Sequence, residues 1–353
     1  NVPALSGTQR QGRHRPRTAD SAVRRSAHLP HRGAAFHRPA STPGAQRRAR
    51  LFFVQSNQDT PPRRAALTGP LRRSLPAAQQ AAVDDEILRV HQPALLETLT
   101  AVHEAAQTER VFLDPDTVMS AHSLEAARLA AGGVVDASRA LVRGELDAAF
   151  CLPRPPGHHA TPDQAMGFCL INHIPIAAAD LLQAVSVERI AIVDFDVHHG
   201  NGTQDIFYDD PSVFFFSTHQ SPWYPGTGAR QETGTGKGLG STLNRPFPAG
   251  TDRKKILPTY AEELRAAADK FRPGLVLVSA GFDSRIGDPL GHFRLTDNDF
   301  AELTDVLVDI ANRHAGGRLV SVLEGGYNIN GLAAASASHC RRLVHAAGQT
   351  DSD

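Results

Sequence analysis

The sequence predicts an α/β domain in which a mostly parallel sheet is covered by helices on both faces. From about residue 81 onward, short apolar and β-branched segments alternate with segments of helical periodicity, an order that favours parallel strands joined by helices. The apolar segments are continuous rather than alternating, as strands buried on both faces should be. With 353 residues, 41% of them hydrophobic, the chain can bury a sizeable core.

Composition excludes several classes of protein. The content of apolar residues argues against a wholly disordered chain, and neither a coiled-coil nor a collagen-like pattern is present. No apolar run reaches the about 18 residues that predict a membrane helix. Cys151, Cys169 and Cys340 are too few and too scattered for a disulfide framework or a CxxC zinc site. We therefore expect a reducing compartment, most simply a cytoplasm.

The balanced charge of the chain hides two unlike parts. Residues 1–80 contain 15 Arg, no Lys and only two acidic residues, a charge of +13, and residues 81–353 carry −13. We expect residues 1–75 to be an atypical leader that is disordered and without specific function, with a single candidate strand at Leu51–Val54. An organellar transit peptide, a basic arm for a polyanion and an artefact of gene prediction are the alternatives. The ordered domain is expected at 76–348, followed by a tail at 349–353.

The expected elements follow from local pattern. A helix is predicted over 297–314 because Thr296 and Asp299 have capping-box spacing and the apolar residues that follow recur on one helical face. A long loop is predicted at Gly226–Gly250 from its glycines and prolines. The other helices are expected at 83–107, 122–143, 166–185, 254–271 and 329–346. Strands are expected at Ala148–Leu152, Arg189–Phe195, Ser212–Ser217, Leu275–Ala280 and Leu319–Leu323.

Unusual polar residues follow four of these strands. The segments are Arg154–His159, Asp194–Gly202, Gly281–Asp283 and Glu324–Tyr327. Ligands of open α/β sheets bind beyond the carboxyl ends of the strands. The sequence therefore predicts one site at this edge, built from Asp, His and Tyr side chains of separate segments.

A divalent metal is the simplest explanation for the acidic group in this set. Asp194, Asp196 and His198 stand at alternate positions, which place side chains on the same side of an extended chain. Asp196 and His198, joined by Asp283, would form an Asp₂His site with open positions for water and substrate. The ligand types suit Zn²⁺, and they also allow Fe²⁺ or Mn²⁺. The alternative is that the carboxylates cap the following helix or face solvent.

His158, His159 and Tyr327 are the candidates for proton transfer and carbonyl activation. A carboxylate beside one imidazole would keep it charged, and a neutral partner would leave the other free to exchange protons; Asp194 and Asn201 are the candidate partners. The phenol of Tyr327, brought close by the two preceding glycines, could donate to an oxyanion. Surface or structural histidines, and a buried tyrosine with a satisfied hydroxyl, are the alternatives.

Seven motifs resemble the histone deacetylase family, in particular its class II-like branch with bacterial and organellar amidohydrolases. They run in order over about residues 80–345: RPPGHHA at 154–160, MGFC at 166–169, VDFDVHHGNGTQ at 193–204, PGTG at 225–228, SAGFD at 279–283, DPLG at 288–291 and LEGGY at 323–327. The resemblance implies an arginase-like single domain with about eight strands. It also implies zinc-dependent hydrolysis of Nε-acetyl-lysine or acyl-lysine in proteins.

The resemblance also implies residue roles. His159 would be the general base and acid, held by Asn201, with His158 and Asp194 as an electrostatic pair and Tyr327 polarising the acyl carbonyl. One zinc ion would be bound by Asp196, His198 and Asp283. Substrate would contact Asp116 at the rim, Gly167, Phe168 and Tyr224 along an apolar channel, and Leu290. A structural K⁺ would use Asp194, Asp196, His198, Ser217 and Thr218.

Other functions remain open from the sequence. Acetylpolyamine amidohydrolysis is the main alternative, although the apolar Leu290 offers nothing to a second ammonium group and favours acyl-lysine. A polyanion-binding protein that uses the Arg-rich segment and a Mn²⁺ ureohydrolase are more distant. The expected partner is an acylated lysine protein or peptide, or an acetylated small amine; no membrane or nucleic acid is expected, and a homo-oligomer is allowed.

One departure from the family concerns the start of the domain. The family opens with a strand and a His-Pro-Glu loop at the mouth of the active site, and residues 1–75 contain no such match. We therefore predict low activity or poor stability for the chain as written.

Overall fold

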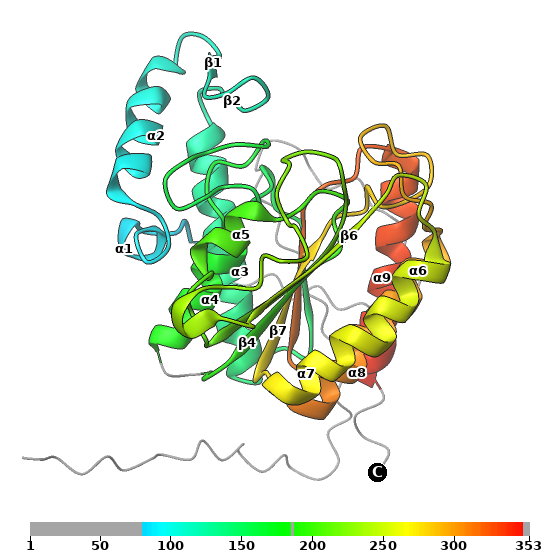
Figure 1. Ribbon diagram of the computed structural model, residues 1–353. Helices are drawn as coiled ribbons and strands as arrows, with labels where there is room; N and C mark the ends of the chain where they lie inside the picture. Colours follow the sequence, from blue (N-terminus) through cyan, green and yellow to red (C-terminus); the bar gives the residue numbers. More distant parts are fainter. Residues whose placement is uncertain (1–79, 185–186, 349–353) are drawn as a thin grey trace, which may run out of the picture. The chain divides into compact units, whose positions relative to one another are not determined.

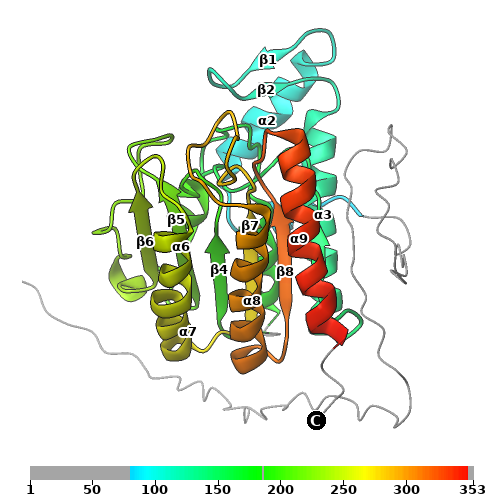
Figure 2. The ribbon, with the colours of Figure 1, turned by 90° about the vertical axis from the view of Figure 1, so that its right-hand side faces the viewer.

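The computed structural model describes residues 80–184 and 187–348, and a six-stranded parallel sheet forms the centre of this described part. The strands lie in the order β3-β8-β7-β4-β5-β6, and every neighbouring pair is parallel (Figures 1 and 2). Their bounds are Ala149–Cys151 for β3, Ile190–Asp194 for β4, Val213–Gln220 for β5, Thr242–Phe247 for β6, Leu275–Ala280 for β7 and Leu319–Leu323 for β8.

Helices cover both faces of this sheet. Alternate strand residues point to opposite faces, so Ile192 packs in one core with the early helices and Val193 in the other with the late ones. The early helices are α1 Asp84–Ile87, α2 Pro93–Ala105, α3 Ser123–Val142, α4 His173–Gln183 and α5 Asn201–Ile206. The late helices are α6 Arg253–Pro258, α7 Arg265–Phe271, α8 Asp297–His314 and α9 Ile329–Gly348, in front of the sheet in Figure 2. The predicted fold class is confirmed, with six strands in the described sheet instead of about eight.

The helix predicted from its capping box is present as α8. Thr296 and Asp299 form the reciprocal cap, in which the Asp299 carboxylate accepts from the Thr296 N–H at 2.7 Å. Phe300, Leu303 and Leu307 are fully buried on the face that the periodicity indicated. Burial of such side chains, each worth about 1.5–3 kcal/mol, fixes α8 against the sheet.

Two predicted helices have different bounds in the structure. The segment 83–107 is divided into α1 and α2, with Pro93 at the first position of α2, where its missing N–H costs nothing. The segment 166–185 becomes helical only at His173, because residues 166–169 form a tight turn. Residues 254–271 are helical as predicted, with a π-helical turn at Thr259–Leu264 between α6 and α7.

The predicted loop at Gly226–Gly250 contains a strand. β6 pairs with β5 alone and is therefore an edge strand of the described sheet. An edge strand tolerates Pro246 and needs no continuous apolar run, and this explains why β6 lacks the pattern of the other five. A separate two-stranded antiparallel hairpin, β1 Val111–Phe112 and β2 Val118–Met119, was also not predicted.

The carboxyl ends of the parallel strands lie at the upper end of the sheet in Figure 2, the same end as the β1–β2 hairpin. The predicted leader at 1–75, its candidate strand Leu51–Val54 and the tail at 349–353 lie outside the described residues. Among the helices of the described part, none combines the length and the apolar character needed to cross a bilayer.

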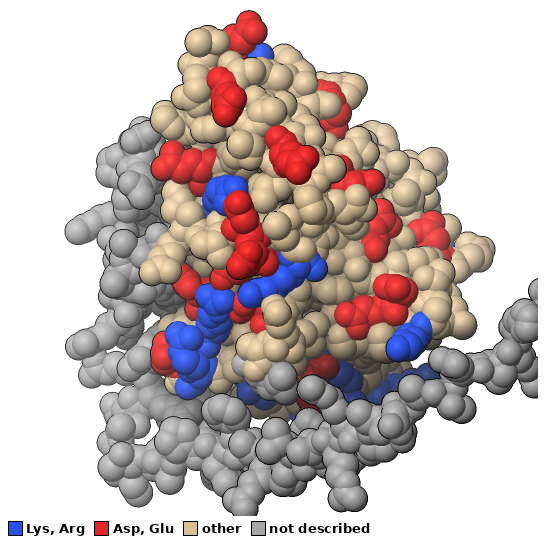
Figure 3. Space-filling view, turned by 90° about the vertical axis from the view of Figure 1, so that its left-hand side faces the viewer, with Lys and Arg blue, Asp and Glu red and all other residues tan. Residues whose placement is uncertain are grey.

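The face that carries α1 and α2 is mixed in charge. Figure 3 shows acidic side chains spread over this face and basic side chains gathered mainly in a band in its lower part, next to acidic ones. Arg128 and Asp84 form one such ion pair at 2.6 Å. Mixed charge of this kind differs from the continuous basic surface that binds nucleic acid.

Candidate active site

Asp196, His198 and Asp283 come together at the carboxyl edge of the sheet. The first two follow β4, and Asp283 follows the adjacent strand β7. One potential ligand atom from each side chain can be chosen so that all three lie within 4.8 Å of one another. His198 Nδ1 is 2.9 Å from Asp196 Oδ1 and 3.2 Å from Asp283 Oδ2. The sequence prediction that these residues meet is borne out by this geometry.

The electrostatics of this group fit a divalent cation. Burial raises the pKa of Asp283 to about 7, and the nearby Asp196 adds to the rise. Burial alone would lower the pKa of His198, but the two carboxylates raise it to about 11. Asp283 Oδ2 is buried without a hydrogen bond. Two carboxylates and one imidazole are a donor set that suits zinc and leaves further coordination positions open.

Gly325 allows the two carboxylates to approach the backbone after β8. Its N–H donates to Asp196 Oδ2 at 2.9 Å. A Cβ atom at this position would lie 2.2 Å from Asp283 Oδ2 and 2.6 Å from Asp196 Oδ2. Only glycine fits at this point, which explains on steric grounds why the first glycine of the LEGGY motif is needed.

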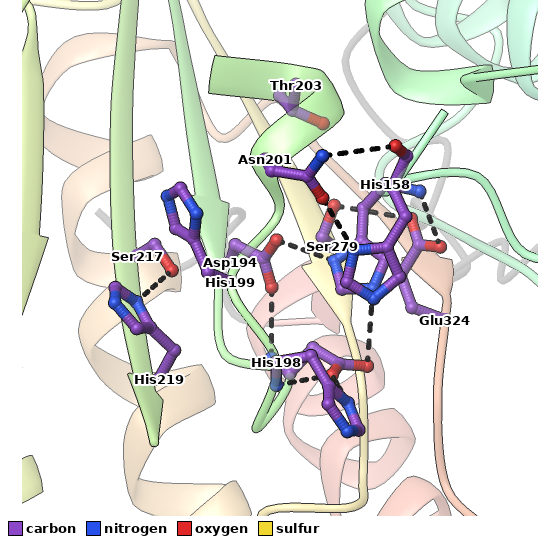
Figure 4. A network of polar contacts seen from close by, with 12 residues as sticks. His158, Asp194, His198, His199, Asn201, Thr203, Ser217, His219, Ser279 and Glu324 are labelled. Atoms are coloured by element: carbon purple, nitrogen blue, oxygen red, sulfur yellow. Dashed lines mark hydrogen bonds and ion pairs between the residues drawn. The ribbon is translucent and has the colours of Figure 1, made fainter. Parts of the chain in front are cut away.

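His158 and His159 lie beside this group with different partners. Their ring centroids are 4.0 Å apart. Nδ1 of His158 donates to Asp194 Oδ2 at 3.0 Å (Figure 4). Nδ1 of His159 lies 2.8 Å from Asn201 Oδ1. Both partners are those that the sequence indicated, and Asp194 itself stands outside the Asp196–His198–Asp283 group.

The amide of Asn201 determines the tautomer of His159. Its Nδ2 points to the carbonyl of His159 at 3.5 Å and to Met166 Sδ at 3.4 Å. The amide oxygen therefore faces Nδ1, which must carry the hydrogen, because a carbonyl oxygen only accepts. Nε2 of neutral His159 is left with a lone pair that can take a proton.

The two imidazoles have opposite pKa shifts. Burial opposes charge on His158, but attraction to Asp194 and Asp196 outweighs it and raises its pKa to about 10. Burial and repulsion from His158 and His198 hold the pKa of His159 well below its usual value. Burial raises the pKa of Asp194 to about 6, so at neutral pH its carboxylate is still largely ionised. The pair thus consists of one charged and one neutral ring.

Tyr327 completes the group from the segment after β8. Its backbone N–H donates to Asp288 Oδ2 at 2.7 Å, and its ring centroid is 6.1 Å from that of Phe168. Burial, reinforced by the charges of Asp283 and Asp196, raises the pKa of its phenol. The hydroxyl is therefore neutral and keeps its proton for donation.

Comparison with known proteins places this site in a family. The model of the histone deacetylase domain matches residues 58–343. A probable deacetylase of Archaeoglobus fulgidus is 42% identical over 247 residues, 70% of this chain and 67% of that protein. The histone deacetylase-like amidohydrolase of Pseudomonas aeruginosa is 40% identical over 266 residues, 75% of this chain and 68% of that protein.

The chain belongs to the histone deacetylase family. A plant relative, the chloroplastic histone deacetylase 14 of Arabidopsis thaliana, is 39% identical over 268 residues, 74% of this chain and 63% of that protein. The crystal structure of the HDA15 HD domain superposes with a TM-score of 0.73 at 35% identity and covers 78% of this chain and 77% of that one. The family consists of zinc-dependent hydrolases of the deacetylase and amidohydrolase class, so the enzyme class predicted from the motifs is confirmed.

A tight turn places Phe168 at this deacetylase site. Gly167 and Phe168 both have positive φ, +58° and +66°, as a type I′ turn requires. Cross-bonds between Met166 and Cys169 close the turn at 3.1 and 2.9 Å. A Cβ at Gly167 would lie 2.4 Å from the His159 ring. The turn thus explains the residues of the MGFC motif, and it also explains why α4 begins at His173 and not at the predicted residue 166.

The other predicted substrate residues are linked to this site by individual contacts. Asp116 lies between β1 and β2, and the neighbouring Thr117 accepts from the Phe168 N–H at 3.0 Å, which ties this hairpin to the turn. The Tyr224 ring is edge-on to His159, with centroids 5.1 Å apart and an interplanar angle of 88°. Leu290 is 37% exposed. Its carbonyl accepts from the indole N–H of Trp223, the residue before Tyr224, at 2.9 Å. We call the region of Asp116, Tyr224 and Leu290 the predicted mouth of the site.

Ser217 and Thr218 of the predicted potassium site lie on β5 beside the end of β4, where Ser217 is in register with Asp194. The Ser217 hydroxyl donates to His219 Nδ1 at 2.9 Å, and Thr218 Oγ1 lies 3.0 Å from the Tyr260 hydroxyl. These contacts fix the two residues close to Asp194 but leave the potassium prediction untested.

Two anchoring residues were missed in the sequence. Glu324 is buried, accepts from the N–H groups of Gly157 and His158 at 2.7 and 3.2 Å, and so holds the loop of the histidine pair (Figure 4). Asp288 fixes Tyr327 in the same way, as described above. Both stand inside the motifs LEGGY and DPLG, but their partners are remote in sequence, so only the fold reveals the contacts.

Proposed function

We propose that this chain removes acetyl or other acyl groups from the Nε atom of lysine in proteins and releases acetate, or the corresponding acid, and free lysine. The observation that carries the proposal is the position of His159, whose neutral ring lies beside the Asp196–His198–Asp283 group, with ring centroids of His159 and His198 5.9 Å apart. Amide hydrolysis needs a polarised carbonyl and a base for water, and this arrangement provides residues for both.

Asp196, His198 and Asp283 are the proposed ligands of zinc. When bound, zinc supplies a Lewis acid that polarises the acyl carbonyl and acidifies water. The remaining work is assigned to the chain. His159 takes the proton of the attacking water at Nε2 and returns it to the leaving lysine amine. Tyr327 donates its hydroxyl hydrogen to the developing oxyanion.

His158 and Asp194 act in this proposal as a fixed charge pair. Burial holds the pKa of His159 low, and the positive ring of His158 against it lowers that pKa further, so that His159 is neutral before reaction and releases its proton readily afterwards. Asn201 holds the tautomer that leaves Nε2 free. This division of roles follows the general rule that partners set the proton affinity of an imidazole.

The mouth of the site favours acyl-lysine. We assign the apolar walls to Phe168 and Tyr224, the contact with the substrate backbone to Asp116, and close passage of the chain at the turn to Gly167. Leu290 offers an acyl-polyamine no partner for its second ammonium group. Acetylpolyamine hydrolysis is the alternative that the experiment must separate.

The direct test compares acetyl-lysine peptide and acetylspermidine at equal concentrations of zinc-loaded full-length enzyme. We expect higher kcat/KM for the peptide, and we expect Tyr327→Phe to reduce peptide turnover about a hundredfold to a thousandfold, the usual loss for one oxyanion donor. Zinc content measured on both proteins serves as the control. Preference for acetylspermidine would assign the chain to the alternative, and full activity of the variant would remove Tyr327 from the mechanism.

Three further expectations stay proposals. A structural K⁺ would be coordinated by Asp194, Asp196 and His198 carbonyls with Ser217 and Thr218, and activity should then depend on K⁺ over Li⁺. A bacterial cytoplasm is the proposed location, or an organelle if residues 1–75 are a transit peptide. Homo-oligomer formation is open to measurement by light scattering.

A further inference from the structure

Trp223, the only tryptophan of the chain, directly precedes Tyr224, whose ring lies beside that of His159. Its indole N–H donates to the carbonyl oxygen of Leu290 at 2.9 Å. Its ring is edge-on to His292, with centroids 4.7 Å apart and an interplanar angle of 88°. These two contacts hold the indole in one orientation against the segment 288–292.

The segment 288–292 is itself attached to the catalytic group. Asp288 accepts from the backbone N–H groups of Tyr327 and Asn328 at 2.7 and 3.0 Å. At the other end, the His292 N–H donates to Gln220 Oε1 at 2.9 Å, at the carboxyl end of β5. Trp223 and Leu290 are therefore fixed relative to Tyr327 on one side and to the sheet on the other.

Three neighbouring apolar side chains are exposed at this position. Trp223, Tyr224 and Leu290 have exposed fractions of 38%, 37% and 37%. Tyr224 also contacts the His159 ring, so this exposed surface adjoins the proposed path of the acyl-lysine to the catalytic group. An apolar surface that adjoins a substrate channel indicates a ligand contact more strongly than isolated exposed residues do.

The mouth has an acidic part as well. Asp116 lies on the β1–β2 hairpin, which is tied to Phe168 through Thr117, and the charges of Asp116 and Asp114 contribute to the raised pKa of Tyr224 after the larger effect of burial. A carboxylate can accept backbone N–H groups of a peptide. An extended peptide held in this way would project the side chains next to its acyl-lysine onto the surrounding rim.

We infer that Trp223 and Leu290 form a subsite for a large apolar side chain that flanks the acyl-lysine of a peptide substrate. The inference rests on the proposed function and adds sequence preference to it. The subsite is preorganised, because the indole hydrogen bond and the edge-on His292 ring are made before substrate arrives, and rigid aromatic contacts of this kind carry a large share of binding energy.

The test uses two pairs of acetyl-lysine peptides. In the first pair, the residue directly before the acetyl-lysine is leucine or glycine, and in the second pair the residue directly after it is leucine or glycine. For at least one pair, the wild-type enzyme should show about tenfold higher kcat/KM for the leucine peptide, a normal value for one apolar contact. Trp223→Ala should bring that ratio close to one, and Trp223→Phe should keep part of it. Acetyl-lysine amide, which is too short to reach the subsite, reports folding and chemistry.

Leu239→Ala is the matched control. Leu239 is 70% exposed but precedes β6, at the opposite end of the sheet from the mouth, so its removal should leave the peptide ratio unchanged. A leucine-to-glycine ratio that is close to one in wild type, or that is equal in wild type and Trp223→Ala, would overturn the inference.

The emission of the single tryptophan gives a second readout that needs no turnover. In zinc-loaded His159→Ala, the leucine peptide should shift or quench Trp223 emission at lower concentration than the glycine peptide. No difference between the two peptides would count against the subsite. Hydrolysis of none of the peptides by wild type would instead contradict the proposed function, and the two failures are therefore distinguishable.

Discussion

Two pairs of buried imidazoles lie at the carboxyl end of the sheet, and they differ in their partners. His158 and His159 have ring centroids 4.0 Å apart, and His199 and His219 have centroids 4.6 Å apart. Figure 4 shows His158 on one side of Asp194 and His199 and His219 on the other. Residue type, burial and spacing are alike, so any difference in behaviour must come from the groups around each pair.

The second pair has only neutral hydrogen-bond partners. His199 lies 2.8 Å from the Thr227 hydroxyl and 3.1 Å from Gln204 Oε1. His219 Nε2 donates to the carbonyl of Gly228 at 2.9 Å, and its Nδ1 accepts from Ser217. Burial therefore dominates, holding the pKa of His199 well below its usual value and lowering that of His219 to about 4.

The comparison teaches that nearby carboxylates, Asp194 above all, distinguish an imidazole pair suited to proton transfer from a pair that only anchors a loop. In the first pair, Asp194 keeps one ring charged and so tunes the other. In the second pair, both rings stay neutral and fix the segment 227–228, close after Tyr224 in the chain. The same residue type serves the reaction in one place and the architecture of the channel in the other.

The largest difference between the pairs should appear on removal of one ring from each. We expect His159→Ala to lower kcat about a thousandfold or more, at the upper range for a general acid–base group, with zinc content unchanged. His219→Gln, which keeps a neutral polar side chain, should lower kcat less than tenfold. Similar losses in both variants would show that the pairs are not divided in this way.

A smaller effect is expected when the charge is removed from the first pair. In Asp194→Asn, the pKa of His158 should fall, because burial opposes its charge and the closest carboxylate is gone, although Asp196 and Glu324 still favour the charged ring. We expect kcat to fall about a hundredfold and the pH–rate profile to change shape. Turnover of one acetyl-lysine peptide between pH 5 and 9 measures this, and an unchanged profile would contradict the role of Asp194.

The sequence predicts most of what is local or dictated by motif. Apolar runs located β4 and β7, and the polar residues that follow them predicted that Asp196, His198 and Asp283 would meet, because parallel strands end at one edge. These inferences need only strand direction and residue type. They fail where a segment lacks its own pattern, as in β6 at the sheet edge.

The remainder depends on contacts between distant segments. Glu324 supports a loop 166 residues away at His158, and no periodicity reveals such a bond. The neutral state of His199 likewise follows from Gln204 and Thr227, which reach it only in the fold. The sequence contains two adjacent pairs of histidines, at 158–159 and at 198–199. Only the structure shows that the His199 ring packs against the ring of His219 and not against that of the adjacent His198.

The smallest expected effect concerns stability against pH, where the pairs should act with opposite sign. The folded pKa of His219, about 4, lies below its unfolded value near 6.5, so the unfolded state binds more protons between these values and stability falls as pH drops from 6.5 to 4. The loss reaches at most about 3 kcal/mol, since one pKa unit corresponds to about 1.4 kcal/mol. His158, with a folded pKa of about 10, instead contributes stability that is complete below pH 6.5 and lost as pH rises toward 10.

Urea unfolding of metal-free wild type and His219→Gln at pH 4.5 and 7.5 measures the contribution of His219. The other titrating groups are the same in both proteins, so their contributions cancel in the difference between the two free energies of unfolding. At pH 7.5 the variant should be less stable than wild type, because it lacks the packing of the imidazole and its hydrogen bond to Gly228. The difference in free energy of unfolding between the two proteins should become smaller or change sign at pH 4.5. A difference in free energy of unfolding that is the same at both pH values would mean that His219 has the same pKa in the folded and unfolded states. Its neutral surroundings would then not set its proton affinity, and the contrast between the two pairs would rest on His158 and Asp194 alone.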